Sequence, residues 1–202
     1  MDLFLLTTLA AIAGWTVKVR DQRRRVRLLG SFLSRYQIER HMETLTQGYL
    51  RALGEDDPER SGPIWNTLRA TEQALGAEFK RFAADFSRTA AAQARTTRLP
   101  FDLPLATRLI PGFSFDMRAA LAIHGRGIAA AVEGHDDITL KAKAFTLSAE
   151  LFLMQHTCHW FCKSKTVASA RMLARHKTSY EQLLAAVAPQ TREAYLALVR
   201  PR

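Results

Sequence analysis

The densest group of reactive side chains lies between His156 and Cys162, where seven consecutive residues include two histidines and two cysteines. On a helix, His159 and Cys162 are three residues apart, and Cys158 and Cys162 are four apart. Each pair would share a face and could supply two ligands to zinc or another soft metal. A structural zinc needs four ligands, and the other histidines are scattered along the chain. We therefore expect His156, Cys158, His159 and Cys162 to be core residues, with a metal-binding enzyme or sensor as the alternative.

The cysteine spacing also bears on the redox state of the chain. Cys158 and Cys162 are its only cysteines. A bridge across one helical turn closes almost no loop, so we expect free thiols and a reducing compartment.

Glu150 is the second residue that could take part in chemistry, because it is the only charged residue between Lys143 and Lys163. Burial in an apolar helix raises the pKa of a carboxyl group unless a cation lies beside it. We expect a structural hydrogen bond or an ion pair with an arginine of the preceding helix, with a catalytic acid as the alternative. The sequence has no nucleophile elbow, phosphate-binding loop or His-Glu-x-x-His motif, so it predicts no cofactor and gives an enzyme no support.

The N-terminal segment is the clearest local signal. Residues 3–17 contain no charge, and as a helix they would be about 22 Å long against a bilayer core of about 30 Å. Trp15 is placed as an interfacial aromatic residue would be. We predict a membrane anchor, either spanning or lying in the interface, with a buried core helix as the alternative.

The net charge of +10 is concentrated in two short segments, residues 18–27 and 163–177, each with five more basic than acidic residues. Because basic flanks stay in the cytoplasm, the first segment predicts a cytoplasmic domain and contact with anionic lipid. The second predicts a cationic helical face, with nucleic-acid binding through both segments as the alternative. The predicted membrane flank is Trp15, Lys18, Arg20, Arg23, Arg24, Arg25 and Arg27, and the predicted basic patch is Lys163, Lys165, Arg171, Arg175 and Lys177.

Apolar residues recur at helical spacing through the rest of the chain, and no segment shows the alternation of apolar and polar residues that is typical of a strand. The predicted class is therefore all-α. The expected architecture is a bundle around a long central helix, preceded by the hydrophobic N-terminal helix. The predicted domains are an anchor with its basic flank, residues 1–27, and a helical-bundle domain, residues 28–202.

Specific start and stop signals place the expected helices. The first three expected helices run from Leu28 to Gly54, from Pro63 through the alanine run 90–94, and from Phe115 with Ser114 as its cap. The fourth runs from Asp136 or Asp137 to about His176, with a kink allowed. The last two are opened by a capping box at Thr178–Glu181 and by Thr191. The glycines at 125 and 127 predict a kink or close helix packing within the third of these.

Residues 95–113 contain three prolines among apolar side chains. We expect this segment to be a loop whose apolar side chains cover the core, with a lid, groove wall or partner-binding surface as the alternative.

Together these patterns predict a membrane-tethered cytoplasmic helical domain that acts as a protein-interaction or adaptor module, with an unidentified protein partner. Arginine exceeds lysine and the helices are rich in alanine, as in many bacterial proteins, so the expected location is the bacterial inner membrane.

Overall fold

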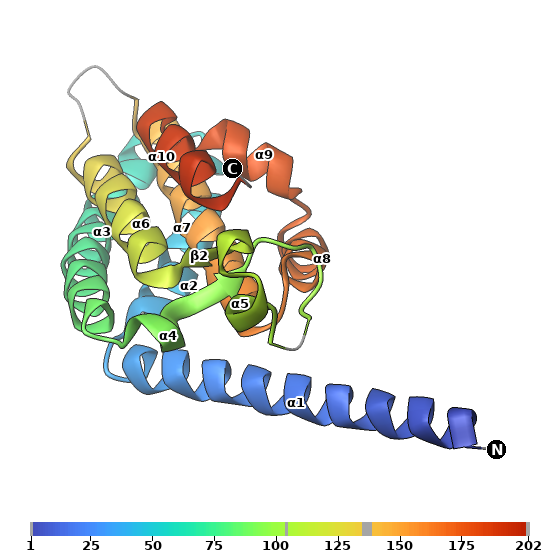
Figure 1. Cartoon of the computed structure of the whole chain (residues 1–202). Coiled ribbons are helices and arrows are strands. Elements are labelled where there is room, and N and C mark those ends of the chain that lie inside the picture. The colour runs from blue at the N-terminus through green and yellow to red at the C-terminus, as the bar shows by residue number, and fades with distance from the viewer. Residues whose placement is uncertain (1, 104, 135–138, 201–202) are drawn as a thin grey trace.

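The computed structural model describes residues 2–103, 105–134 and 139–200. It is all-α apart from one small sheet, as predicted, and its helices surround α7 (Figure 1). The elements are α1 (Asp2–Leu33), α2 (Ile38–Leu53), α3 (Pro58–Ser87), α4 (Ala91–Ala94), β1 (Arg95–Thr97), α5 (Ala106–Leu109), the 3-10 helix η1 (Pro111–Phe113), β2 (Ser114–Asp116), α6 (Met117–Glu133), α7 (Leu140–Cys162), α8 (Lys165–His176), α9 (Tyr180–Ala186) and α10 (Pro189–Val199).

The N-terminal helix α1 is unbroken over 32 residues, which is about 48 Å. Its N-terminal half projects beyond the domain, and its C-terminal half packs against α3 and α7 (Figure 1). In the parts of the chain that the structure describes, α1 is the one helix long and apolar enough to cross a membrane. A turn at residues 34–37 separates it from α2, so the helix that we expected from Leu28 to Gly54 is two helices.

The core lies between α2, α3, α6 and α7, and it confirms the predicted apolar face of α3. Phe79, Phe82 and Phe86 are completely buried there, and the ring of Phe86 packs edge-on against Phe161 of α7. The helix begins at Pro58 and not at Pro63, because the Asp57 side chain caps it by accepting a hydrogen bond from the Glu59 amide.

A two-stranded antiparallel sheet, β1 with β2, was not predicted. Thr96 pairs with Phe115, and the alanine run that was expected to extend α3 forms the separate short helix α4. Ser114 lies in β2, so the predicted cap is wrong, and Asp116 caps α6 by accepting from the Arg118 amide. Strands of three residues are too short for an alternating pattern to be read from sequence.

The predicted helix from residue 138 to 176 is two helices. The backbone of Lys163 leaves the helical region, with φ −131° and ψ −86°, and Ser164 then caps α8 by accepting a hydrogen bond from the Val167 amide. At the other end, Thr139 caps α7; the predicted starts at Asp136 and Asp137 lie outside the described residues. The break turns α8 back onto α7, so the second basic segment lies mainly on a helix of its own.

The last two helices also begin one or two residues away from the predicted positions. A capping box opens α9, but it pairs Ser179 with Gln182 and not Thr178 with Glu181. Helix α10 begins at Pro189, which leaves Thr191 buried in its first turn.

The proline-containing loop differs most from expectation. Its apolar side chains were predicted to cover the core, but six of them are exposed, with Phe101 63% and Leu109 73% exposed. The other four are Leu103, Leu105, Ile110 and Phe113. Asp102 lies between two of these exposed residues and is itself buried.

Candidate functional site

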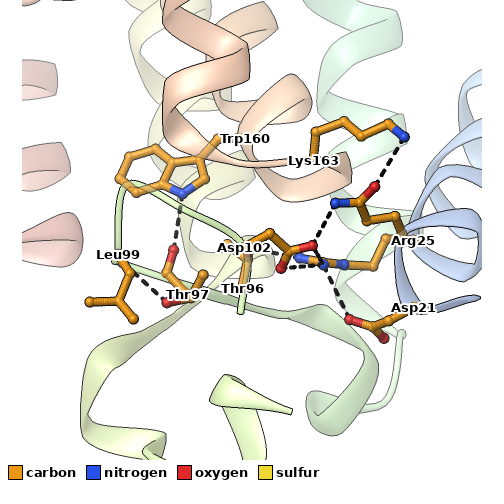
Figure 2. Close-up of polar contacts among 9 residues, drawn as sticks. Asp21, Arg25, Thr96, Thr97, Leu99, Asp102, Trp160 and Lys163 are labelled. Atoms are coloured by element: carbon orange, nitrogen blue, oxygen red, sulfur yellow. Dashed lines mark hydrogen bonds and ion pairs between the residues drawn. The ribbon is translucent and has the colours of Figure 1, made fainter. Parts of the chain in front are cut away.

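Helix α1 is joined to the domain through a buried ion pair (Figure 2). The Arg25 guanidinium donates through Nη2 to both carboxylate oxygens of Asp102, at 2.8 and 2.9 Å, and through Nη1 to the Thr96 hydroxyl at 3.2 Å. Asp21, one turn earlier, lies 3.1 Å from the same guanidinium. Arg25 was predicted to belong to the membrane flank. In the structure its side chain is almost completely buried against the domain.

Gln22 provides a second link in the junction between α1 and the domain. Its amide nitrogen donates to Asp102 at 2.7 Å, and its amide oxygen accepts from Lys163 Nζ at 3.1 Å. Residues from α1, the loop after β1 and the end of α7 are therefore held by one set of polar contacts. Sequence reasoning missed Gln22 and Asp102, although an acidic residue between Phe101 and Leu103 in an apolar loop was the available signal.

The strand β1 is fixed to α7 by an indole. Trp160 Nε1 donates to the Thr97 carbonyl at 2.9 Å, and the Thr97 hydroxyl accepts from the Leu99 amide (Figure 2). The Trp160 ring also packs edge-on against Phe115 of β2. These contacts set the start of the loop that carries Asp102 to Arg25.

A cavity of about 780 Å³ opens beside this junction, between α1, the start of α2, the end of α7 and α8. Its floor is apolar, and its rim carries four cationic side chains and the carboxylate of Glu39. The floor includes Leu29, Leu33, Met42 and Met154, and the rim cations are Arg23, Arg27, Lys163 and Arg171. The two basic segments that were separate in the sequence thus meet around one apolar cavity.

The side chains of the His-Cys cluster, all on α7, have different surroundings. Cys158, His159 and Cys162 line the cavity, whereas His156 donates to or accepts from the Ser169 hydroxyl at 3.0 Å and stacks on Tyr180. Among the described residues, no three His, Cys, Asp or Glu side chains are placed to hold a metal ion. The structure therefore does not bring together the four metal candidates.

The ionisation states at the cavity follow from burial. Desolvation raises the pKa of Cys162 to about 11 and the pKa of the more deeply buried Cys158 further, so both thiols are protonated and weakly nucleophilic at neutral pH. His159 Nδ1 lies 3.2 Å from Arg171 Nη1, and since a guanidinium only donates, that nitrogen accepts. Burial and then Arg171 lower the pKa of His159, which keeps it neutral.

Glu150 lies in the core, away from the cavity. Its Oε1 accepts a hydrogen bond from the Ala188 amide at 3.1 Å, which confirms the predicted structural hydrogen bond. In the described part of the chain no cation pairs with it, so the arginine partner was wrong. Burial raises the pKa of this carboxyl, partly opposed by hydrogen bonds from Thr191 and Ala188. Gly127 faces the same carboxyl, where a Cβ would overlap it.

A buried polar chain that was not predicted runs beside Glu150. His124 Nε2 lies 2.9 Å from the Thr157 hydroxyl, which lies 3.0 Å from the Tyr195 hydroxyl. Desolvation lowers the pKa of His124 to about 3, so this imidazole is neutral. These groups fill a packed core and bear on stability.

The predicted basic patch is not one continuous face. Lys165 lies over the rings of Trp160 and Tyr180 and so turns toward the protein, whereas Lys163 donates to Gln22 beside the cavity. Arg171 and Arg175 are exposed on α8, and Lys177 ends it in a left-handed conformation. Nucleic-acid binding through the two basic segments stays a prediction.

No protein-family model, curated protein or solved structure matches this chain. The features of the molecule that bear on function are therefore α1, its junction with the domain and the cavity.

Proposed function

We propose that this protein is a single-pass membrane protein whose helical domain acts as a non-enzymatic binding module on the cytoplasmic side of the membrane. The observation that carries the proposal is the N-terminal half of α1. From Leu3 to Trp15 its large apolar side chains, including Phe4, Leu6 and Leu9, are more than half exposed, and none of the window that is apolar enough to span is buried in the protein. Water is an unfavourable surrounding for such a helix, and lipid is a favourable one.

The polar groups of this half-helix fit the same proposal. The hydroxyls of Thr7, Thr8 and Thr16 all donate to carbonyls of the preceding turn, at 2.8 to 3.0 Å. In a hydrocarbon core, a side-chain donor has no water to bind, so a helix that satisfies its own hydroxyls is suited to lipid. Lys18 lies 5.8 Å from the Trp15 ring, a pairing suited to the headgroup region.

The exposed loop supports a domain held close to the membrane. Gln22, which donates to Asp102 of the loop, is five residues after Val17. It therefore lies about 7.5 Å further along α1. Phe101 and Leu103, on either side of Asp102, are exposed at this level. Apolar side chains near the boundary of the hydrocarbon region add to membrane affinity and compensate for a short span.

The orientation and the compartment follow from charge. The basic residues after the apolar half keep that end of α1 in the cytoplasm, which puts residues 28–202 there as well. The bacterial inner membrane is the proposed location.

The test is fractionation of cells that express the full chain, with salt and carbonate washes and protease access from each side. The full chain is expected to stay in the membrane and a variant lacking residues 2–17 to be soluble. Leu9→Arg places a charge in the middle of the apolar half, which costs about 2.5 to 3.5 kcal/mol in a spanning helix, or roughly a hundredfold in partitioning.

Leu50→Arg is the matched control, because Leu50 is also more than half exposed but lies on α2. It should leave the membrane fraction unchanged. If the full chain washes off like the truncated one, the tether is rejected.

A further inference from the structure

The cavity beside α1 has the size and lining of a ligand site. Its volume of about 780 Å³ lies within the range of roughly 300 to 1,000 Å³ typical of small-molecule sites. Leucine, isoleucine and valine side chains line it together with Met42 and Met154, whose unbranched side chains adapt to flexible apolar ligands. The floor therefore suits a hydrocarbon chain.

The rim adds a charge requirement. In the described parts of the chain, no carboxylate forms an ion pair with Arg23, Arg27, Lys163 or Arg171, and Glu39 is the one acidic residue that lines the cavity. Cations without acidic partners around an apolar floor complement a molecule with a hydrocarbon tail and an anionic head.

The position of the rim indicates where such a molecule would come from. Arg23 is six residues after Val17 on the same helix, which is about 9 Å beyond the apolar half. A phospholipid of the adjoining leaflet is the amphiphile that the tether holds at high effective concentration beside this opening.

We propose that the cavity binds an acyl chain of an anionic phospholipid, with the headgroup phosphate held by the arginines and lysine of the rim. The source of the lipid rests on the proposed membrane tether, and the fit of an anionic amphiphile rests on the cavity alone. The domain thus binds acidic lipid, and occupancy of the cavity fills the space between α1 and α7.

The chain contains its own reporter of occupancy. Cys158 and Cys162 are its only cysteines and both line the cavity, with Cys162 partly exposed. A bound acyl chain covers Cys162 and slows its alkylation by a maleimide. Because the pKa of this thiol is raised to about 11, the reaction is followed at mildly alkaline pH and each cysteine is assigned by peptide mass.

A glycine in the lining allows the cavity to be blocked without strain. A Cβ on Gly30 of α1 would meet no atom within 4 Å, so Gly30→Phe fills the space with a ring. Gly62→Phe is the matched control, since Gly62 lies in α3, also has open space, and is absent from the lining. For the rim, Arg171→Gln is compared with Arg175→Gln, an exposed arginine on the same helix that does not line the cavity.

The experiment uses the full chain in nanodiscs of phosphatidylcholine, with or without phosphatidylglycerol. In the wild type and in Gly62→Phe, phosphatidylglycerol is expected to slow alkylation of Cys162 by about tenfold, as for a site about nine-tenths occupied. Gly30→Phe should abolish this dependence on lipid composition, and Arg171→Gln should weaken it much more than Arg175→Gln does.

Equal alkylation rates in the two lipid compositions, or a lipid effect that persists in Gly30→Phe, overturns the proposal and leaves the cavity to a protein partner. Protection that depends on the number of chains per disc, and not on the lipid, also overturns it in favour of a second copy.

Failure of the tether is seen separately, because the chain then does not stay with the discs. In that case the same alkylation assay in solution, with lysophosphatidylglycerol against lysophosphatidylcholine, decides whether the cavity binds an anionic amphiphile.

Discussion

Two apolar helices of this protein have opposite surroundings. Helix α7 is buried on most sides, with Leu147, Leu153 and Phe161 completely inaccessible, whereas the N-terminal half of α1 is exposed on every side. Hydrophobicity all around a helix is compatible with a protein core or with lipid, and composition alone does not separate the two.

The polar residues of the two helices show which surrounding each one suits. In α7, Glu150, His156 and Thr157 find partners on other elements, at Ala188, Ser169 and Tyr195. In the exposed half of α1, the threonine hydroxyls bond only to carbonyls of their own helix. Thus α7 depends on the tertiary structure for its hydrogen bonds, and the exposed half of α1 does not.

The largest effect is expected from a substitution that breaks the junction at which α1 changes from an exposed helix to a packed one. Asp102→Ala leaves the Arg25 guanidinium buried without its carboxylate, which should lower the free energy of unfolding by about 3 to 5 kcal/mol. Urea unfolding of the full chain in a mild detergent, followed by tryptophan fluorescence, measures this loss.

Two companion variants sharpen that measurement. Asp21→Ala removes the half-exposed partner of the same guanidinium and should cost at most about 1 kcal/mol. Arg25→Met with Asp102→Leu removes both charges and should recover most of the lost stability. Equal losses for Asp102→Ala and Asp21→Ala would show that the buried pair does not hold α1 to the domain.

The second prediction applies one substitution to both apolar helices. Leu153→Ala opens a cavity in the core and should cost about 2 to 5 kcal/mol of unfolding free energy. Leu9→Ala, on the exposed half of α1, should change it by no more than about 0.5 kcal/mol. The same urea titration compares them, and a large effect of Leu9→Ala would mean that this half-helix packs against protein.

The third prediction tests how closely α6 approaches the buried carboxyl of α7. A Cβ on Gly127 would overlap the Glu150 carboxyl and the Thr191 hydroxyl, so Gly127→Ala should destabilise the fold by about 1 to 3 kcal/mol. At Gly125, a Cβ would make only ordinary contacts, with the Phe79 ring at 3.7 Å and the Ala83 Cβ at 4.0 Å, so Gly125→Ala should stabilise by about 0.5 to 1 kcal/mol through helix propensity. Thermal unfolding should show shifts of opposite sign, and shifts of the same sign would contradict this packing.

The smallest effect is a pH dependence confined to α7 and its neighbours. Burial raises the pKa of Glu150 above its ordinary 4.5, so the folded state keeps a proton that the unfolded state loses. Stability therefore falls as pH rises from 4.5 toward the folded pKa, by at most about 1.4 kcal/mol per pH unit. Glu150→Gln stays neutral, so its stability relative to wild type should increase with pH over that range. A constant difference across the range would show that Glu150 is ionised in the folded state.

The neutral histidine of the same helix gives the opposite slope and serves as the internal comparison. Burial lowers the pKa of His156 from 6.5 to about 3, so the unfolded state binds the extra proton between these values and stability falls as pH decreases. His156→Gln should make this acidic limb less steep, with His124 still contributing to it, and should leave the Glu150 effect unchanged.

The local features of the fold were predictable from the residues. Helical periodicity indicated the buried face of α3, and a run without charge indicated the N-terminal helix. The spacing of Cys158, His159 and Cys162 also placed them on one face, and they do line one cavity. Each of these properties is set within a few turns of helix, so neighbouring residues are sufficient to indicate it.

Other features depend on residues far apart in the chain. The pairing of Thr96 with Phe115 and of Arg25 with Asp102, and the meeting of Arg23 with Arg171 around one cavity, link positions that no local pattern connects. Local patterns of residue types were enough to indicate the helical class and one helix unlike the others. Which charged side chain is buried, and where an opening remains, depends on how distant surfaces pack against one another, so neither could be predicted from local patterns.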